Sequence, residues 1–530
     1  MLKKLFVSGL FLMGILEAWA QEDMPLVDKI DRGFKPIADA WVSIIFYSIP
    51  ISGLEVPLVL IVLIAGGLYF SIYFAFPQFK LFKTAIKVVA GKYDDIDHHD
   101  SMPIYGDPTP TLDEDIPETI KIEGEHHGEV SHFQALSAAL SATVGLGNIA
   151  GVAVAIALGG PGATFWMILA GLLGMASKFT ECTLGVKYRD IGPDGTVFGG
   201  PMYYLKKGLT KMGHGLLGKF LAIFFAIMVV GGSFGGGNMF QANQATAQFI
   251  ELFGIQNANV KIIFGIVLAF FVGIVIIGGI KRIGKVAEKI VPFMAVLYVG
   301  AALLILFMHY DLIPRAFSLI VSEAFTPQAG LGGFIGVMIM GFRRGTFSNE
   351  AGVGSAAIAH SAVKTKYPAS EGIVALLEPF IDTVVICTMT ALVLIITNLK
   401  YGLFSYGEKI EGVELTARAF DQVLPHFSII LTVAVILFAF STMLSWSYYG
   451  LQGWKFIFGR SKKVDLIYKI LFLFFIVLGA SVKLGSVLDF SDAMIFAMVF
   501  PNMIGIIILA PEVKQELKRY LQAIKNKEKD

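Results

Sequence analysis

The stretch that decides the fold covers residues 133–177 and reads FQALSAALSATVGLGNIAGVAVAIALGGPGATFWMILAGLLGMAS. It holds 45 residues without a charged side chain, whereas one helix needs roughly 20 apolar residues to cross a bilayer. The sequence GGPG at residues 159–162 lies inside the stretch and favours a tight turn. The stretch therefore predicts two membrane-spanning helices joined by a short turn.

Uncharged runs of similar character recur along the rest of the chain. Backbone N–H and C=O groups in hydrocarbon need partners within their own segment, so runs this apolar are expected to be helices rather than strands. With the two helices of residues 133–177, they predict an all-α integral membrane protein with about eleven crossings. The other nine runs are residues 56–76, 220–250, 262–280, 290–308, 324–342, 383–399, 427–454, 470–482 and 493–511.

The composition excludes several classes of protein. Of the 530 residues, 55% are hydrophobic and 16% are charged, against about 25% charged in soluble domains, which argues against a cytosolic enzyme. The net charge of +1 hides an acidic insertion at residues 94–130. Basic residues interleaved with aromatic ones do not cluster outside short loops, so nucleic acid is not an expected partner. Cys182 and Cys387 are too few for a zinc site or a disulfide framework and are expected to be buried.

The first 54 residues predict where the chain begins relative to the membrane. Residues 1–20 combine Lys3 and Lys4 with an apolar run and the small-residue pattern Ala18-Trp19-Ala20, as in a secretory signal peptide. An uncleaved anchor is the alternative. Cleavage places residues 21–54 outside, with an amphipathic stretch at 37–51 on the membrane surface.

The charges of the loops give an independent prediction of orientation. Residues 55–76 form an extra span, after which the loop at 77–131 is expected to be cytoplasmic. That loop opens with four Lys residues, and the tail at 511–530 is basic as well, as expected for segments on the cytoplasmic side. The N-terminus is therefore expected outside and the C-terminus inside.

Two glycine-rich segments predict interrupted helices. The first is SATVGLGN at residues 141–148, and the second is GFRRG at residues 341–345. Each opens a set of five predicted helices, residues 132–308 and 309–510. Paired interruptions in corresponding helices point to an inverted-repeat transporter whose site lies at the breaks. Close packing of ordinary helices is the alternative explanation for the glycines.

The first interruption offers groups that can bind both an anion and a cation. Unwound backbone at Gly145, Gly147 and Asn148 frees amides that favour a carboxylate, and it frees carbonyls that suit a hard cation such as sodium. The hydroxyls of Ser441 and Thr442 could complete an oxygen cage, or they could bond to their own helix.

Further polar residues lie within apolar runs. Asn238 and Gln241 are three residues apart and share a helix face, so they could bind a zwitterionic substrate or join helices. Glu350 follows the second interruption near Arg343 and Arg344, which suggests a gate, a structural ion-pair clamp, or both. A proton-coupled carrier with Glu350 as the proton site is the alternative to sodium coupling. A channel or sensor scaffold fits less well, because the polar residues concentrate at two points rather than along a stripe.

Several ordered motifs resemble the alanine/glycine:cation symporter family over about residues 55–510. The motifs are GLGNIAGVA at 145–153, GGPGATFWM at 159–167, GNMFQAN at 237–243, IKRIGKVAEK at 280–289 and RGTFSNEAGVGSA at 344–356. The resemblance implies a LeuT-like 5+5 inverted-repeat core with one extra N-terminal helix. It also implies sodium-coupled import of a small neutral amino acid, alanine or glycine, across a bacterial inner membrane by alternating access, without an enzymatic activity or a cofactor other than the coupling ion.

The resemblance also implies roles for individual residues. Sodium would be held by the carbonyls of Ser141 and Val144 and by the hydroxyls of Ser441 and Thr442. The substrate carboxylate would lie on the amides of the first interruption, and other side chains would border the substrate or limit its size. The implied substrate-binding residues are Gly145, Leu146, Gly147, Asn148, Asn238, Gln241, Met340, Phe342 and Trp446.

Three positions depart from the family pattern. Leu146 stands where the family commonly has Thr, which removes a hydroxyl beside the substrate and leaves the choice of amino acid open. Ile168 replaces a usual Trp and Ala357 replaces a usual Pro, and both changes are expected to affect packing only.

Overall fold

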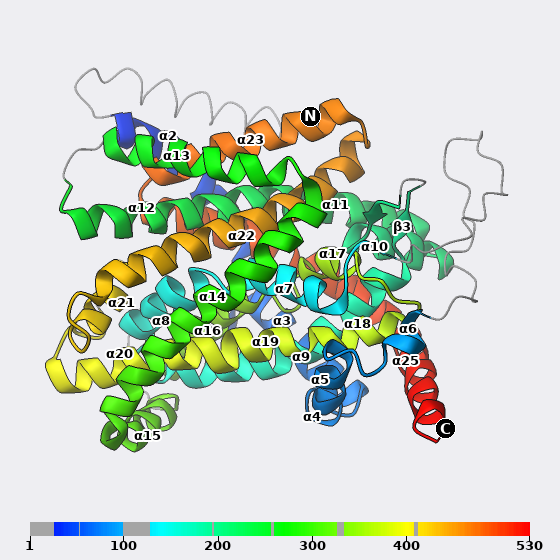
Figure 1. The fold of residues 1–530 in the computed structure, drawn as a ribbon, viewed down its shortest axis with the longest axis horizontal. Helices are drawn as coiled ribbons and strands as arrows, with labels where there is room; N and C mark the ends of the chain where they lie inside the picture. Colours follow the sequence, from blue (N-terminus) through cyan, green and yellow to red (C-terminus); the bar gives the residue numbers. More distant parts are fainter. Residues whose placement is uncertain are drawn as a thin grey trace.

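The computed structural model describes residues 26–51, 54–98, 128–192, 195–255, 259–325, 333–407 and 412–529. The predicted signal peptide and residues 99–127 of the acidic insertion lie outside these ranges. Apart from two short antiparallel hairpins, the described chain is helical (Figure 1). The all-α membrane class predicted from the sequence is confirmed.

Several helices and one hairpin precede the first five-helix set, and one of these helices, α3, is short and apolar. They are α2 (Leu26–Ile45), β1 (Ser48–Ile51), β2 (Leu54–Pro57), α3 (Leu58–Tyr73), α4 (Pro77–Lys80), α5 (Phe82–Val89) and α6 (Asp94–His98).

The first set contains two helices with π-helical segments, η1 and η2. Its elements are α7 (His132–Thr143), η1 (Gly147–Gly151), α8 (Val152–Gly159), α9 (Ala163–Lys187), β3 (Asp190–Ile191), β4 (Val197–Phe198), α10 (Pro201–Lys211), α11 (Gly215–Phe234), η2 (Gly235–Met239), α12 (Phe240–Phe253), α13 (Asn259–Ile276) and α14 (Gly279–Met308).

The second set follows a short connection. Its elements are η3 (Tyr310–Leu312), α15 (Ile313–Glu323), α16 (Gly333–Asn349), α17 (Ala356–His360), α18 (Pro368–Ala375), α19 (Leu377–Pro379), η4 (Phe380–Cys387), α20 (Thr388–Tyr401), α21 (Gly412–Asp421), α22 (Phe427–Phe458), α23 (Lys462–Ser481), α24 (Leu484–Ala497) and α25 (Val499–Lys527).

By length and composition, eight continuous helices in the described residues can cross a membrane, or nine with the bent α7–α8 pair. Two of the eleven predicted spans correspond to shorter helices. Residues 56–76 form the 16-residue α3, and the span at 324–342 is shifted to the 17-residue α16. The other predicted runs all coincide with helices that pass the test.

The second predicted interruption is wrong in position. Gly341 and Gly345 lie within the continuous helix α16, and they allow it to pack closely on α9. A Cβ on Gly341 would lie 2.5 Å from the Ala163 carbonyl oxygen, and one on Gly345 would lie 3.2 Å from the Ala170 Cβ. The chain leaves the helix only at Glu350, whose φ is +55°. The small-xxx-small spacing therefore serves helix packing here.

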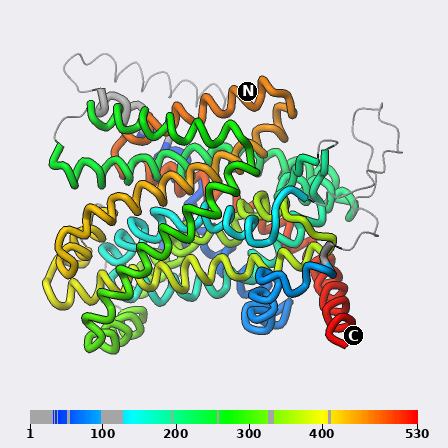
Figure 2. Tube along the Cα trace, in the orientation of Figure 1, coloured from blue at the N-terminus to red at the C-terminus, as the bar shows by residue number. Residues whose placement is uncertain are grey.

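The late helices of the second set pack against the first set. In Figure 2, α22 and α23 run alongside α11–α13 although at least 150 residues separate them. A Cβ on Gly265 of α13 would lie 2.9 Å from the Cβ of Ala480 in α23. Glycines at these contacts let the helix backbones approach each other closely, as in membrane helix bundles.

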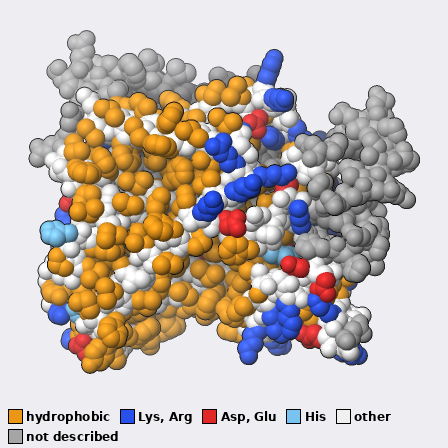
Figure 3. Space-filling model, in the orientation of Figure 1, with side chains coloured by type: hydrophobic (Ala, Val, Ile, Leu, Met, Phe, Trp, Pro, Cys, Tyr) orange, Lys and Arg blue, Asp and Glu red, His pale blue; other side chains and the backbone are white. Residues whose placement is uncertain are grey.

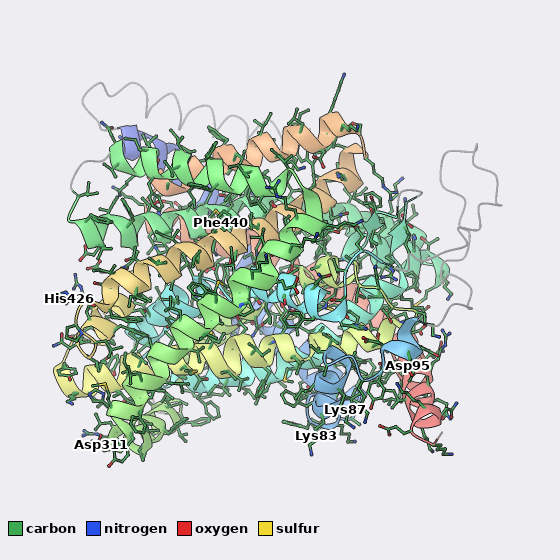
Figure 4. All side chains as sticks on the ribbon, in the orientation of Figure 1. Lys83, Lys87, Asp95, Asp311, His426 and Phe440 are labelled. Carbon is green, nitrogen blue, oxygen red and sulfur yellow. The ribbon has the colours of Figure 1, made fainter. Side chains whose placement is uncertain are left out.

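Polar and apolar surfaces separate along the molecule. Hydrophobic side chains cover one part of the face in Figure 3, while Lys and Arg gather toward the other end. Figure 4 places Lys83, Lys87 and Asp95 toward one end, and Asp311 and His426 toward the opposite end, with Phe440 of α22 between them. Residues next to Phe440 in the sequence are therefore near the middle of the molecule.

Candidate functional site

The first interruption is present as predicted. The helix axis bends by 49° between α7 and the η1–α8 segment, and Val144 has non-helical backbone angles of φ −74° and ψ 89°. The Gly145 amide donates to Asn148 Oδ1 at 2.8 Å instead of to a carbonyl of the preceding turn. Because helix α7 stops there, backbone groups of the preceding turn lose their usual partners.

The four predicted sodium-binding residues meet at the contact between α7 and α22. The Ser141 hydroxyl donates to the Ser441 carbonyl at 2.8 Å, and a Cβ on Gly145 would collide with Thr442 Oγ1. Thr442 Oγ1 is buried and has no hydrogen-bond partner among the described residues. Ser441 Oγ instead donates to the Phe438 carbonyl of its own helix at 3.0 Å.

A small cavity lies beside this contact. Its volume is about 10 Å³, enough for about one water molecule. It is lined by Ala142, Thr143, Gly147, Gly236, Gln241, Phe347, Ser348, Glu350, Trp446 and Ile495. Four of these residues were predicted to be functional: Gly147, Gln241, Glu350 and Trp446. The sequence did not predict that Thr143, Phe347, Ser348 and Ile495 line the site.

The amides predicted to receive the substrate carboxylate are partly occupied. Besides the Gly145 amide, which binds Asn148, the Leu146 amide donates to Gln241 Oε1 at 3.4 Å. Gln241 also donates from Nε2 at 2.9 Å to the carbonyl of Gly236, which lies within the π-helical segment η2. Of the three predicted residues 145–147, only Gly147 lines the cavity.

Three predicted substrate residues point elsewhere. Asn238 donates to the Phe472 carbonyl at 2.6 Å and so joins α23 to η2. Met340 packs beside Gly159 of α8. The Phe342 ring lies 6.0 Å from the ring of Trp166 on α9. Their side chains therefore contact neighbouring helices in this structure, and none of them lines the cavity.

The predicted clamp between Glu350 and the two arginines is also wrong. Arg343 Nε donates to Asp492 of α24 at 2.8 Å, and Arg344 binds the same carboxylate. Glu350 instead accepts from Trp446 Nε1 at 3.0 Å and from the Ser355 hydroxyl. Helix α16 ends at Asn349, so Glu350 leaves the helix toward Trp446 and Ser355, while Asp492 binds both arginines.

Asn148 connects the interruption to a buried carboxylate that sequence reasoning missed. Its Nδ2 donates to Asp382 Oδ1 at 2.6 Å, and Asp382 Oδ2 accepts from Ser348 and Thr383 at 2.9 and 2.6 Å. Cys387 Sγ lies 3.3 Å from the same Asn148 nitrogen. Asp382 directly precedes the predicted span at 383–399. A carboxylate at the edge of an apolar run is a candidate functional residue, and this signal could have identified Asp382 from the sequence.

A second buried cluster runs from α7 to α9. His132 and His360 both bind Glu371, and His360 also faces Glu378 at 3.4 Å. Lys178 Nζ lies 2.9 Å from Glu378 Oε1, and both side chains are fully buried. The cluster ties together α7, α9, α17, α18 and α19 with charges that are costly to separate inside a membrane protein.

A helical membrane protein with an interrupted helix and a small polar cavity at the break has the construction of a secondary transporter. Residues 111–530 match the sodium:alanine symporter family, and the chain belongs to that family. Its members couple amino-acid transport to sodium, so the family predicted from the motifs is confirmed.

Similar proteins carry several substrate names. The sodium/alanine symporter AgcS of Methanococcus maripaludis is 41% identical over 89% of this chain and 96% of its own. The probable sodium/glutamine symporter GlnT of Bacillus subtilis is 36% identical, over 74% of this chain and 78% of its own. The putative sodium/proton-dependent alanine carrier YrbD of the same organism is 36% identical, over 74% and 81%. The crystal structure of MhsT in complex with L-phenylalanine aligns with a TM-score of 0.47 and 17% identity, over 74% of this chain and all of MhsT.

Proposed function

We propose that this protein imports alanine or glycine together with sodium by alternating access. The observation that carries the proposal is the cavity at the first interruption, together with the unpartnered Thr442 hydroxyl beside Gly145 at the same interruption. Phe347, Trp446 and Ile495 line this cavity and leave little room, which favours an amino acid with a very small side chain.

In this proposal the substrate carboxylate approaches Gly147, and Phe347, Trp446 and Ile495 limit the side chain. Sodium lies between the carbonyls of Ser141 and Val144 and the hydroxyls of Ser441 and Thr442. Since Ser441 already bonds within its helix, Thr442 is the hydroxyl that we expect to contribute most.

The proposal is tested by uptake into vesicles containing the purified protein. Radiolabelled alanine should accumulate when sodium is present outside, and it should not when choline replaces sodium at the same pH. Accumulation that is unaffected by the replacement would overturn sodium coupling. Saturation of uptake and exchange against unlabelled alanine inside distinguish a carrier from a channel, and glycine, alanine and glutamine as competitors rank the substrates.

A proton-coupled carrier is the second candidate, because the buried carboxylate of Glu350 lines the cavity. It predicts that an inward proton gradient alone drives accumulation and that Glu350→Gln abolishes this response. We propose a bacterial inner-membrane location, with the mature N-terminus outside and the C-terminus in the cytoplasm.

A further inference from the structure

The start of α14 presents a row of cationic side chains that transport does not explain. Lys281, Arg282, Lys285 and Lys289 are all exposed, while Ile283 and Ala287 between them are buried against the protein. Lys281, Lys285 and Lys289 are spaced by four residues, so they lie above one another on the helix surface. We call these four residues the basic face of α14.

Within the described parts of the chain, none of the four forms an ion pair. The carboxylate nearest in sequence, Glu288, lies 3.3 Å from Gln134 Nε2 of α7. Some basic residues elsewhere in the described chain are paired, for example Lys455 with Asp465 at 2.8 Å. The basic face is therefore a concentration of positive charge that the described protein does not neutralise.

The same helix face continues as an apolar surface. The residues that follow along it are large and exposed: Phe293, Val296, Leu303, Leu304 and Phe307. With the exposed Gly300 between Val296 and Leu303, positions 293, 296, 300, 303 or 304, and 307 follow one another at three or four residues. They therefore stay on the face that Lys281, Lys285 and Lys289 begin. A surface this apolar is expected to face lipid, so the basic face lies at the end of a lipid-facing stripe.

The length of the apolar segment sets the depth of the charges. Residues 290–308 are uncharged, and 19 residues at 1.5 Å each span about 28 Å. The hydrocarbon core is about 30 Å thick, so Lys289 and Lys285 reach the headgroup layer when the segment spans the core. Figure 3 shows Lys and Arg side chains in a row beside the hydrophobic surface on the face that α14 crosses.

We propose that the basic face of α14 binds the headgroups of anionic phospholipids. Clustered Lys and Arg next to a membrane span attract anionic lipids, and the phosphate groups of the adjacent leaflet are the anions that already border this surface. The Gln134–Glu288 contact connects the lipid-bound helix to α7, which carries the interruption. The inference concerns the membrane surface and does not depend on which amino acid or ion is transported.

The test counts lipids that remain on the purified full-length protein in native mass spectrometry. We expect phosphatidylglycerol to be retained more than phosphatidylcholine by the unaltered protein. The triple variant Lys281→Gln, Lys285→Gln, Lys289→Gln leaves Arg282 unchanged. It should lose at least half of the excess of phosphatidylglycerol over phosphatidylcholine. The matched control Lys518→Gln, Lys525→Gln, Lys529→Gln removes three exposed charges from α25 and the turn that follows it. It should behave as the unaltered protein.

Equal retention of the two lipids by the unaltered protein would overturn the proposal, and so would equal losses in the two triple variants. If the α14 variant fails to fold, Lys281→Arg, Lys285→Arg, Lys289→Arg takes its place and must retain the phosphatidylglycerol excess. Raising the salt concentration must then reduce that excess in the unaltered protein. Glycerol phosphate, added as a free headgroup, should not displace the lipid, and displacement would instead identify a site for soluble phosphate esters.

Discussion

At the scale of single residues, the structure separates Thr442 from its neighbour Ser441. Both hydroxyls were candidates for sodium, but Ser441 bonds to its own helix, while Thr442 Oγ1 is buried beside Gly145 without a partner among the described residues. A buried hydroxyl without a partner is costly. A bound cation would remove that cost, so Thr442 is the better candidate for a ligand.

We expect Thr442→Ala to raise the sodium concentration for half-maximal uptake by about 2- to 10-fold, the equivalent of one polar interaction of about 0.5–1.5 kcal/mol. Thr442→Ser keeps the hydroxyl and should stay near the unaltered value. Uptake is measured against sodium concentration at constant ionic strength. An unchanged sodium dependence in Thr442→Ala would remove this residue from the ion site.

Gly147 is expected to set the size of the substrate. An added Cβ would lie 3.4 Å from the Ser348 Cα, an ordinary contact that the fold can accept, but it would enter the cavity. Gly147→Ala should therefore shift the preference from alanine toward glycine by about tenfold, the equivalent of one carbon atom in an apolar pocket. Competition by the two amino acids for labelled glycine measures the ratio, and an unchanged ratio would show that the substrate lies elsewhere.

Asp382 is expected to act by holding Asn148, which in turn caps the interruption. Asp382→Asn keeps an oxygen acceptor for Asn148 Nδ2 and should retain most uptake, whereas Asp382→Leu should lose more than about tenfold, because Asn148 would be left without that partner. The maximal rate and the half-saturating alanine concentration are compared for both variants. Equal loss in the two would indicate that the negative charge, rather than the hydrogen bond, is required.

At the scale of elements, the apolar runs could be predicted because charge-free length is a strong signal. The position of the second interruption could not, because the same glycines either unwind a helix or let it pack. In α16, contacts with α9 decide the outcome, and those contacts join residues that are far apart in the sequence. The partners of the Asn238 and Asn148 side-chain amides could not be predicted for the same reason, since Phe472 and Asp382 each lie 234 residues away along the chain.

Packing at the α9–α16 contact gives a prediction for stability. Gly341→Ala would place a Cβ 2.5 Å from the Ala163 carbonyl oxygen, so we expect it to destabilise the protein by about 1–3 kcal/mol. Gly300→Ala is the matched control, because a Cβ there meets no atom within 4 Å and alanine favours the helix. Thermal unfolding in detergent should show a lower Tm for Gly341→Ala only, and equal values would argue against close packing at this contact.

At the scale of the whole molecule, the positions of labelled charged residues can be compared with the orientation predicted from the loops. Lys83 and Lys87 lie toward one end, and Asp311 and His426 lie toward the other (Figure 4). The sequence predicts that the first of these ends is cytoplasmic, because the basic loops gather there. The buried cluster that contains Lys178, His360 and Glu378 was not predicted, since its members come from five separate helices and only the fold brings them together.

The orientation is tested by labelling single introduced cysteines in intact cells with a membrane-impermeant maleimide. Both native cysteines are free and buried, as the sequence predicted, so their background should be low. Asp311→Cys should react in intact cells, because the predicted topology places the end of α14 outside. Lys83→Cys should react only after the membrane is permeabilised. The reverse pattern would show that the topology is inverted and that the basic face of α14 lies at the outer leaflet. If neither position is labelled in intact cells, Asp311 does not lie on the exposed outer surface.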